Sequence, residues 1–177
     1  VFYRQQLCQM ARELVQLGTE PLDEKRLKRA IHEENKRQVL IEQLNRLRQL
    51  EPWRLKASEA YLLLRAGTLM TARTHTSLLK RFLSAVSERS VQPVDNVRVV
   101  LRGAFCEQPP LALIRTLEKA GCDVVDDDFM LGLSTLNTPI SETLPPLDAL
   151  VQAFLFQGKP SACRYIDKAS KGEELLQ

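Results

Sequence analysis

The sequence predicts an α/β protein, in which a helical subdomain at residues 1–92 precedes the first part of a doubly wound parallel sheet at residues 93–177. Two observations indicate this fold class. Apolar residues recur near the helical period throughout residues 1–90. Beyond Pro93, a β-branched run, an amphipathic segment and a second short apolar run follow in the order strand, helix, strand.

Four helices are expected in the first part. Residues 1–17 form the first, which Gly18 is placed to end. Asp23 is placed to cap the second, which runs to about Leu50 because Pro52 prevents its continuation. The third and fourth occupy residues 58–70 and 75–89. Charges alternate in sign along residues 23–48, which is typical of a solvated helix face. Basic residues outnumber acidic ones in residues 1–100, which also suits a nucleic-acid or phosphate ligand. We favour the interpretation as a solvated helix face and expect no nucleic-acid partner.

The second part begins with VRVVL at residues 97–101, which is typical of a strand buried on both faces of a parallel sheet. An amphipathic helix over residues 111–121 and a strand at 122–125 follow, so we expect a right-handed parallel crossover. A further helix is expected at residues 146–157. Two strands are few for a doubly wound sheet, and the chain begins at Val1. We therefore expect it to be part of a longer polypeptide.

Composition excludes some classes of protein. No apolar run approaches the ~18–20 residues of a membrane span, and we expect no membrane association. The spacing of the four cysteines at positions 8, 106, 122 and 163 matches neither a zinc site nor a disulfide framework, which favours a cytoplasmic protein. There is no nucleotide-binding glycine motif. We expect His32 and His75 to be surface residues, because they lie on helices that look solvated.

The loop that leaves the first strand, residues 102–110, is the first candidate site. Ligands of open parallel sheets bind beyond the carboxyl ends of the strands. Gly103 allows close approach of the backbone, and Cys106 lies just before a helix start, where a thiolate is favoured. Glu107 and Gln108 add polar groups. The alternative is that Cys106 is a small buried residue at a strand–helix junction.

The residues that follow the second strand, Asp126, Asp127 and Asp128, are the second candidate site. Three adjacent carboxylates repel one another, so they either meet a cation, a polar ligand or a basic group, or cap a turn. We expect them at the same sheet edge as residues 102–108. Arg164 and Tyr165 lie in a later polar cluster, which contacts a phosphate-bearing ligand or closes a turn through local salt bridges.

These segments together resemble a known family. RGAFCEQPPL at 102–111, IRTLE at 114–118 and GCDVVDDDF at 121–129 are similar to the benzoyl-CoA reductase and 2-hydroxyacyl-CoA dehydratase family. ACRYIDK at 162–168, with KGE at 171–173, resembles the benzoyl-CoA reductase branch. In the helical part, DEKRL at 23–27 and NKR at 35–37 are similar to the family's long middle helix.

The resemblance implies a catalytic subunit with flavodoxin-like lobes and a 4Fe-4S cluster. It also implies a homologous catalytic subunit as a partner, and separate ATP-hydrolysing subunits that pass on electrons from ferredoxin. The reductases convert the aromatic ring of benzoyl-CoA into a cyclic dienoyl-CoA. The dehydratases eliminate water from an (R)-2-hydroxyacyl-CoA through a ketyl radical, with one recycled electron. A cluster at very low potential suits ring reduction.

One departure from the family pattern concerns the cluster. None of the four cysteines matches a family ligand position, although Cys106 lies in a family motif. We therefore expect the cluster ligands of the full-length protein to lie outside this chain. The sequence leaves three functions open: a benzoyl-CoA reductase subunit, which we favour, a 2-hydroxyacyl-CoA dehydratase subunit, or a non-catalytic scaffold whose helical arm is an interface.

Overall fold

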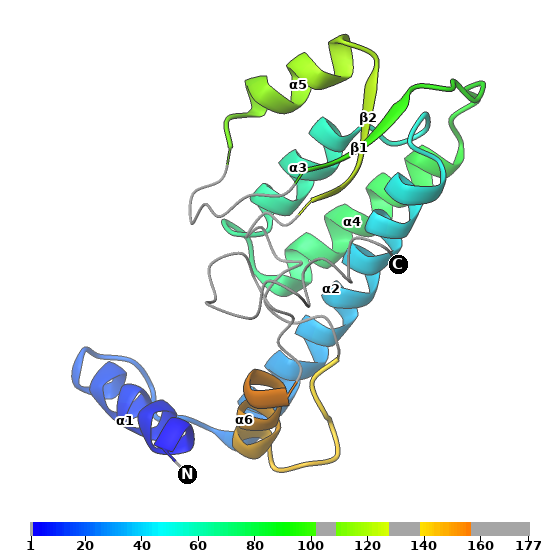
Figure 1. Ribbon diagram of the computed structural model, residues 1–177. Coiled ribbons are helices and arrows are strands. Elements are labelled where there is room, and N and C mark those ends of the chain that lie inside the picture. The colour runs from blue at the N-terminus through cyan, green and yellow to red at the C-terminus, as the bar shows by residue number, and fades with distance from the viewer. Residues whose placement is uncertain (1, 102–108, 128–138, 157–177) are drawn as a thin grey trace.

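A computed structural model describes residues 2–101, 109–127 and 139–156. These residues form six helices and a two-stranded parallel sheet (Figure 1). A helical part thus precedes the start of a parallel sheet, as predicted. In chain order the elements are α1 (Phe2–Gln16), α2 (Glu24–Leu50), α3 (Ala57–Ala66), α4 (Ala72–Ser87), β1 (Val97–Leu101), α5 (Leu111–Lys119), β2 (Cys122–Asp127) and α6 (Pro146–Phe156).

Helix α2 is the long axis of the molecule, and its start and end agree with the prediction. The Asp23 carboxylate accepts hydrogen bonds from the backbone N–H groups of Lys25 and Arg26, which satisfies two donors that the first helical turn leaves unpaired. The helix ends at Leu50, two residues before Pro52. Along its length it packs against α4, α3 and β2, so it connects the helical part to the sheet (Figure 1).

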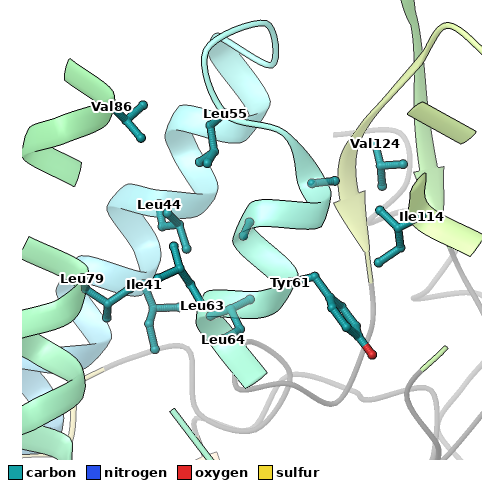
Figure 2. Close-up of a cluster of buried hydrophobic side chains, with 12 residues drawn as sticks. Ile41, Leu44, Leu55, Tyr61, Leu63, Leu64, Leu79, Val86, Ile114 and Val124 are labelled. Atoms are coloured by element: carbon teal, nitrogen blue, oxygen red, sulfur yellow. The ribbon is translucent and has the colours of Figure 1, made fainter. Parts of the chain in front are cut away.

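The main hydrophobic core lies between these elements. Figure 2 shows Leu44 of α2, Leu79 of α4 and the α3 side chains pointing into a common interior, with Ile114 and Val124 at its far side. Since Ile114 belongs to α5 and Val124 to β2, one cluster of buried side chains joins helices α2–α4 to the strand–helix–strand unit. The predicted division at residue 92 therefore falls within elements that share a core.

The two strands are parallel, but the first is less covered than predicted. The sequence predicted that the first strand is buried on both faces, whereas its residues Val97 and Val100 are 67% and 43% exposed. The described residues provide only one neighbour for each strand, and the apolar side chains that are buried come mainly from β2. A run of β-branched residues therefore predicted the strand correctly and its burial wrongly.

Helices α1 and α6 form a separate group beside the start of α2 (Figure 1). The rings of Tyr3 and Phe154 stack with centroids 4.1 Å apart, and Arg4 forms an ion pair with Asp148. Helix α1 ends before Gly18, whose φ of +96° suits glycine, as predicted. The apolar stripe of α1 contributes no buried side chain among the described residues.

Two expectations for the helical part are wrong. The third helix ends at Ala66 rather than Met70. His75 is 1% exposed, not a surface residue. Its ring packs on Gly67, where an added Cβ would lie 2.5 Å from the ring carbon Cε1. Its Nε2 donates a 2.9 Å hydrogen bond to the carbonyl of Leu63. Any side chain at position 67 would therefore collide with this ring.

Candidate functional site

The carboxyl ends of β1 and β2 meet at one edge of the sheet. Leu101, the last residue of β1, lies opposite Asp127, the last residue of β2. Ligands of open parallel sheets bind beyond this edge, because the loops that leave it converge there. The strand ends, with the side chains packed against them, are therefore the candidate site.

Two aspartates at this edge belong to the strand and do not follow it. The sequence placed Asp126 after the second strand, whereas β2 includes Asp126 and Asp127. Val99 lies opposite Val124 and Val100 opposite Asp126, so Val125 is an extra residue on β2. Such a bulge re-aims the side chains beyond it and is often found beside functional sites.

Arg48 of α2 meets these aspartates from inside the protein. Its side chain is 2% exposed, and its Nη1 donates a 2.5 Å hydrogen bond to Oδ2 of Asp127. Its Nη2 lies 3.8 Å from Oδ1 of Asp126, which is within ion-pair distance but beyond a hydrogen bond. A buried guanidinium is stable only if it is paired. The contact with β2 therefore explains how α2 can carry a buried arginine.

The hydrogen bonding of this arginine is incomplete. Neither Nε nor Nη2 of Arg48 has a hydrogen-bond partner, and both atoms are fully buried. Unpaired buried donors are costly, and their occurrence in a folded protein calls for an explanation. The two aspartates also differ: the side chain of Asp127 is 7% exposed and that of Asp126 is 30% exposed. At this edge the Asp127 carboxylate is thus buried and hydrogen-bonded to Arg48, whereas the Asp126 carboxylate is more exposed.

A second ion pair, in which only the carboxylate is buried, lies at the opposite end of β2. The side chain of Asp123, near the start of the strand, accepts hydrogen bonds from Lys56 at 2.8 Å and from Asn96 at 3.3 Å. This pair links β2 to the start of α3, at the opposite end of the strand from the candidate site. The same strand therefore carries one buried carboxylate at each end, with a lysine at one end and an arginine at the other.

Known proteins match the chain over its whole length. A family model described as 2-hydroxyglutaryl-CoA dehydratase, D-component, matches residues 1–177. The chain belongs to this family. It is also 35% identical, over 99% of its own length, to one of the subunits of the benzoyl-CoA reductase of Thauera aromatica. It spans 46% of that relative, a little under half. The predicted resemblance to the reductase and dehydratase family is confirmed.

Of the residues that the sequence singled out in this family pattern, two are brought together. Asp126 and Asp127 lie at the sheet edge with Arg48. The others lie outside the described residues, so their contribution stays a prediction: Gly103, Cys106, Glu107, Gln108, Asp128, Arg164 and Tyr165. The expectation that residues 102–108 share this edge falls on residues outside those described and stays a prediction.

Sequence reasoning missed Arg48, although a signal was present. Ile41, Leu44 and Arg48 are spaced by three and four residues, so they lie on one face of α2. Ile41 and Leu44 are buried, as is Arg48. The alternating charges predict a solvated face instead. An arginine on the same helix face as two core residues indicates a buried cation, which needs an acidic partner.

The described residues do not suit a 4Fe-4S cluster, which needs cysteine thiolates gathered around it. Of the two cysteines whose surroundings the structure describes, Cys8 lies on α1 and Cys122 at the start of β2. No three His, Cys, Asp or Glu side chains gather as a metal site in residues 2–101, 109–127 and 139–156. No helix in these ranges has both the length and the apolar character needed to cross a membrane.

Proposed function

We propose that this chain is part of a catalytic subunit of an ATP-dependent, ferredoxin-linked benzoyl-CoA reductase, a cytoplasmic oxidoreductase that reduces the aromatic ring to a cyclic dienoyl-CoA. The observation that carries the proposal is 35% identity to a benzoyl-CoA reductase subunit across nearly the whole chain. The segments at residues 162–173 resemble the same branch. The partners are a homologous catalytic subunit and ATP-hydrolysing subunits that deliver electrons from ferredoxin.

The proposal assigns the edge formed by Leu101, Asp126 and Asp127 to the acyl-CoA cavity. Support comes from the parallel register, from the bulge on β2 and from the buried Arg48, which together hold polar groups at the place where α/β sheets bind ligands. The division into a helical subdomain at residues 1–92 and an α/β lobe from residue 93 is part of the same proposal. The cluster is assigned to the full-length subunit, with ligands outside this chain.

The test uses the purified full-length subunit with its partner subunits. Reduced methyl viologen or dithionite should be oxidised only when benzoyl-CoA and ATP are both present. Omitting ATP is the control, since it removes the driving force for electron transfer at low potential. A complex that shows no benzoyl-CoA-dependent oxidation would exclude the proposal.

A 2-hydroxyacyl-CoA dehydratase subunit is the second candidate. The description of the matching family, a 2-hydroxyglutaryl-CoA dehydratase component, favours it. A dehydratase eliminates water from an (R)-2-hydroxyacyl-CoA and returns its electron, so it consumes no reductant overall. Formation of an enoyl-CoA without net oxidation of viologen would select this function over the first.

A non-catalytic scaffold is the alternative from another class. The exposed apolar residues of α1, including Phe2, and Leu17 just beyond the helix would then form an interface for a partner. Analysis of iron and acid-labile sulfide in the full-length protein separates the two classes. Stoichiometric iron and sulfide would exclude the scaffold, whereas an iron-free protein would exclude the enzyme for this subunit.

A further inference from the structure

Positive charge is concentrated in helices α2 and α4. These two helices contain 11 Lys and Arg residues and 4 Glu residues. The whole chain contains 25 Lys and Arg and 22 Asp and Glu, so the remainder of the chain contains 14 basic and 18 acidic residues. The two helices lie side by side (Figure 1). The outer side of this helix pair is therefore basic, although the rest of the chain is acidic.

The exposed cations of the helix pair share one surface. The basic face is the surface that contains Lys36 and Arg46 of α2 and Arg73, Lys80 and Arg81 of α4, all of which are exposed. A carboxylate oxygen of Glu33 on α2 lies 3.7 Å from Nζ of Lys36 and 3.9 Å from Nη2 of Arg73, so the two helices meet at this surface. Both distances are longer than a hydrogen bond. Arg46, Lys80 and Arg81 have no ion-pair partner in the part of the chain that the structure describes. The chain itself therefore neutralises these cations only weakly.

Apolar side chains lie among these cations. Val39 and Leu50 are 44% and 57% exposed. Both lie on the side of α2 that carries Lys36 and Arg46, since they follow these cations by three and four residues. Protein–protein contacts combine such apolar side chains with a polar rim. Nucleic acids are held mainly through phosphates and stacked bases, to which exposed aliphatic side chains contribute little. The basic face therefore suits an acidic protein better than a nucleic acid.

A hollow on α4 belongs to the same face. It has a volume of about 450 Å³ and is lined by Lys80, Arg81, Ser84, Ala85 and Glu88. The two cations and the hydroxyl of Ser84 can donate hydrogen bonds to a carboxylate, whereas Glu88 would repel it. Since the cations outnumber the carboxylate, the hollow suits an acidic side chain of a partner protein.

We propose that the basic face docks an acidic surface of the ATP-hydrolysing subunits that deliver electrons. The inference rests on the proposed function, because it takes these subunits as partners. A permanent interface with the homologous catalytic subunit would be large and mainly apolar, whereas only two exposed apolar side chains lie among the five cations here. Electron-transfer encounters bury little surface and are steered by opposite charges. Charge complementarity therefore favours the electron-delivering partner.

The experiment measures how fast the ATP-hydrolysing subunits associate with the full-length catalytic subunits after separate purification. The test variant is the double substitution Lys80→Glu and Arg81→Glu at the hollow. The matched control is Arg115→Glu with Lys119→Glu, which makes the same change in charge at exposed positions of α5. Helix α5 packs on α3 and β2 and lies apart from α4 (Figure 1). Association rates at low and high salt and the melting temperature are measured for each protein.

The test variant should associate about tenfold more slowly than the wild type at about 0.02 M salt, because opposite charges steer such encounters. The difference should disappear at about 0.5 M salt, where the Debye length is only about 4 Å. The control should associate like the wild type, and neither variant should change the melting temperature. Equal slowing in both variants would overturn the inference, since net charge and not the basic face would be responsible. An unchanged rate in the test variant would overturn it too.

Other occupants of the basic face give different results, each of which contradicts the inference. If the rest of the polypeptide covered the face, the test variant would have a lower melting temperature and an unchanged association rate. If the homologous catalytic subunit covered it, the two catalytic subunits would no longer purify together in the test variant. If a nucleic acid covered it, only binding of a fluorescent single-stranded RNA would weaken.

Association is measured without acyl-CoA, which separates this inference from the proposed function. Subunits that associate with the expected salt dependence but do not reduce benzoyl-CoA would contradict the reductase and leave the docking face in place. ATP-dependent reduction of benzoyl-CoA, with unchanged association of the test variant, would support the reductase and exclude the basic face as the docking site.

Discussion

A single arginine connects the helical part to the sheet edge. Arg48 lies on the buried face of α2 and its partner Asp127 is 79 positions away in sequence. The sequence shows that three aspartates stand together and that some group must relieve their repulsion. It does not show which of the many basic residues does so, because that depends on how α2 packs on β2.

Replacing Arg48 by Met should lower the free energy of unfolding by about 3–5 kcal/mol, because it leaves the buried Asp127 without its cation. Chemical denaturation monitored by circular dichroism would measure the loss. Arg46→Met on the same helix is the matched control, since Arg46 is exposed and should change stability by no more than about 0.5 kcal/mol. Equal effects of the two substitutions would contradict the assigned ion pair.

His75 should make stability depend on pH. Burial lowers its pKa below the ordinary value of 6.5, although the hydrogen bond to the Leu63 carbonyl and the nearby Glu34 oppose this shift; Arg37 adds to it. The unfolded chain therefore takes up a proton at higher pH than the folded protein does. Stability is full above pH 6.5 and falls as the pH decreases through the lowered pKa.

Denaturant midpoints measured across that pH range test this expectation. The part of the pH dependence due to His75 should disappear in His75→Gln. It should persist in His32→Gln, because His32 is on the surface beside Glu142. A wild-type and a His75→Gln protein with the same pH dependence would refute it.

At the scale of elements, the sequence predicted most helices and both strands, because their ends carry strong local signals. Asp23, Gly18 and Gly121 act at the predicted boundaries. The third helix was predicted four residues too long, since it ends at Ala66. The burial of His75 was missed, because nothing local shows that its ring packs on Gly67. Burial of the first strand was also mispredicted, because burial depends on which elements cover it.

The cap of α2 can be tested by itself. Asp23→Ala should destabilise the protein by about 1 kcal/mol, because two backbone N–H groups lose their acceptor. Asp23→Asn is the matched control and should cost much less, since asparagine caps helices about as well. The comparison uses denaturant midpoints at neutral pH, and a similar loss in both variants would show that the cap is not the cause.

At the scale of the whole molecule, the core crosses the boundary that the sequence predicted near residue 92. Ile114 of α5 and Val124 of β2 are buried with residues of α2, α3 and α4 (Figure 2). The sequence change at Pro93 marks a change in secondary structure. It contains no information on whether the two sides share side-chain contacts, which is a property of the folded chain.

Shared packing predicts cooperative unfolding. Ile114→Ala should lower the free energy of unfolding by about 2–5 kcal/mol, and the helical part should be destabilised as well. The lone tryptophan, Trp53, lies between α2 and α3 and reports on that part. In the variant, the unfolding transitions measured by tryptophan fluorescence and by far-ultraviolet circular dichroism should both shift to the same lower denaturant concentration. A tryptophan transition that stays in place would show that the two parts unfold independently.

We propose above that the chain belongs to a subunit that reduces an aromatic acyl-CoA. The most direct measurement is mass spectrometry of the acyl-CoA after incubation of the full-length complex with benzoyl-CoA, ATP and reduced ferredoxin. We expect a product that has gained two hydrogen atoms and lost the ultraviolet absorbance of the benzoyl ring. Unchanged benzoyl-CoA, together with conversion of an (R)-2-hydroxyacyl-CoA into its enoyl-CoA, would contradict it.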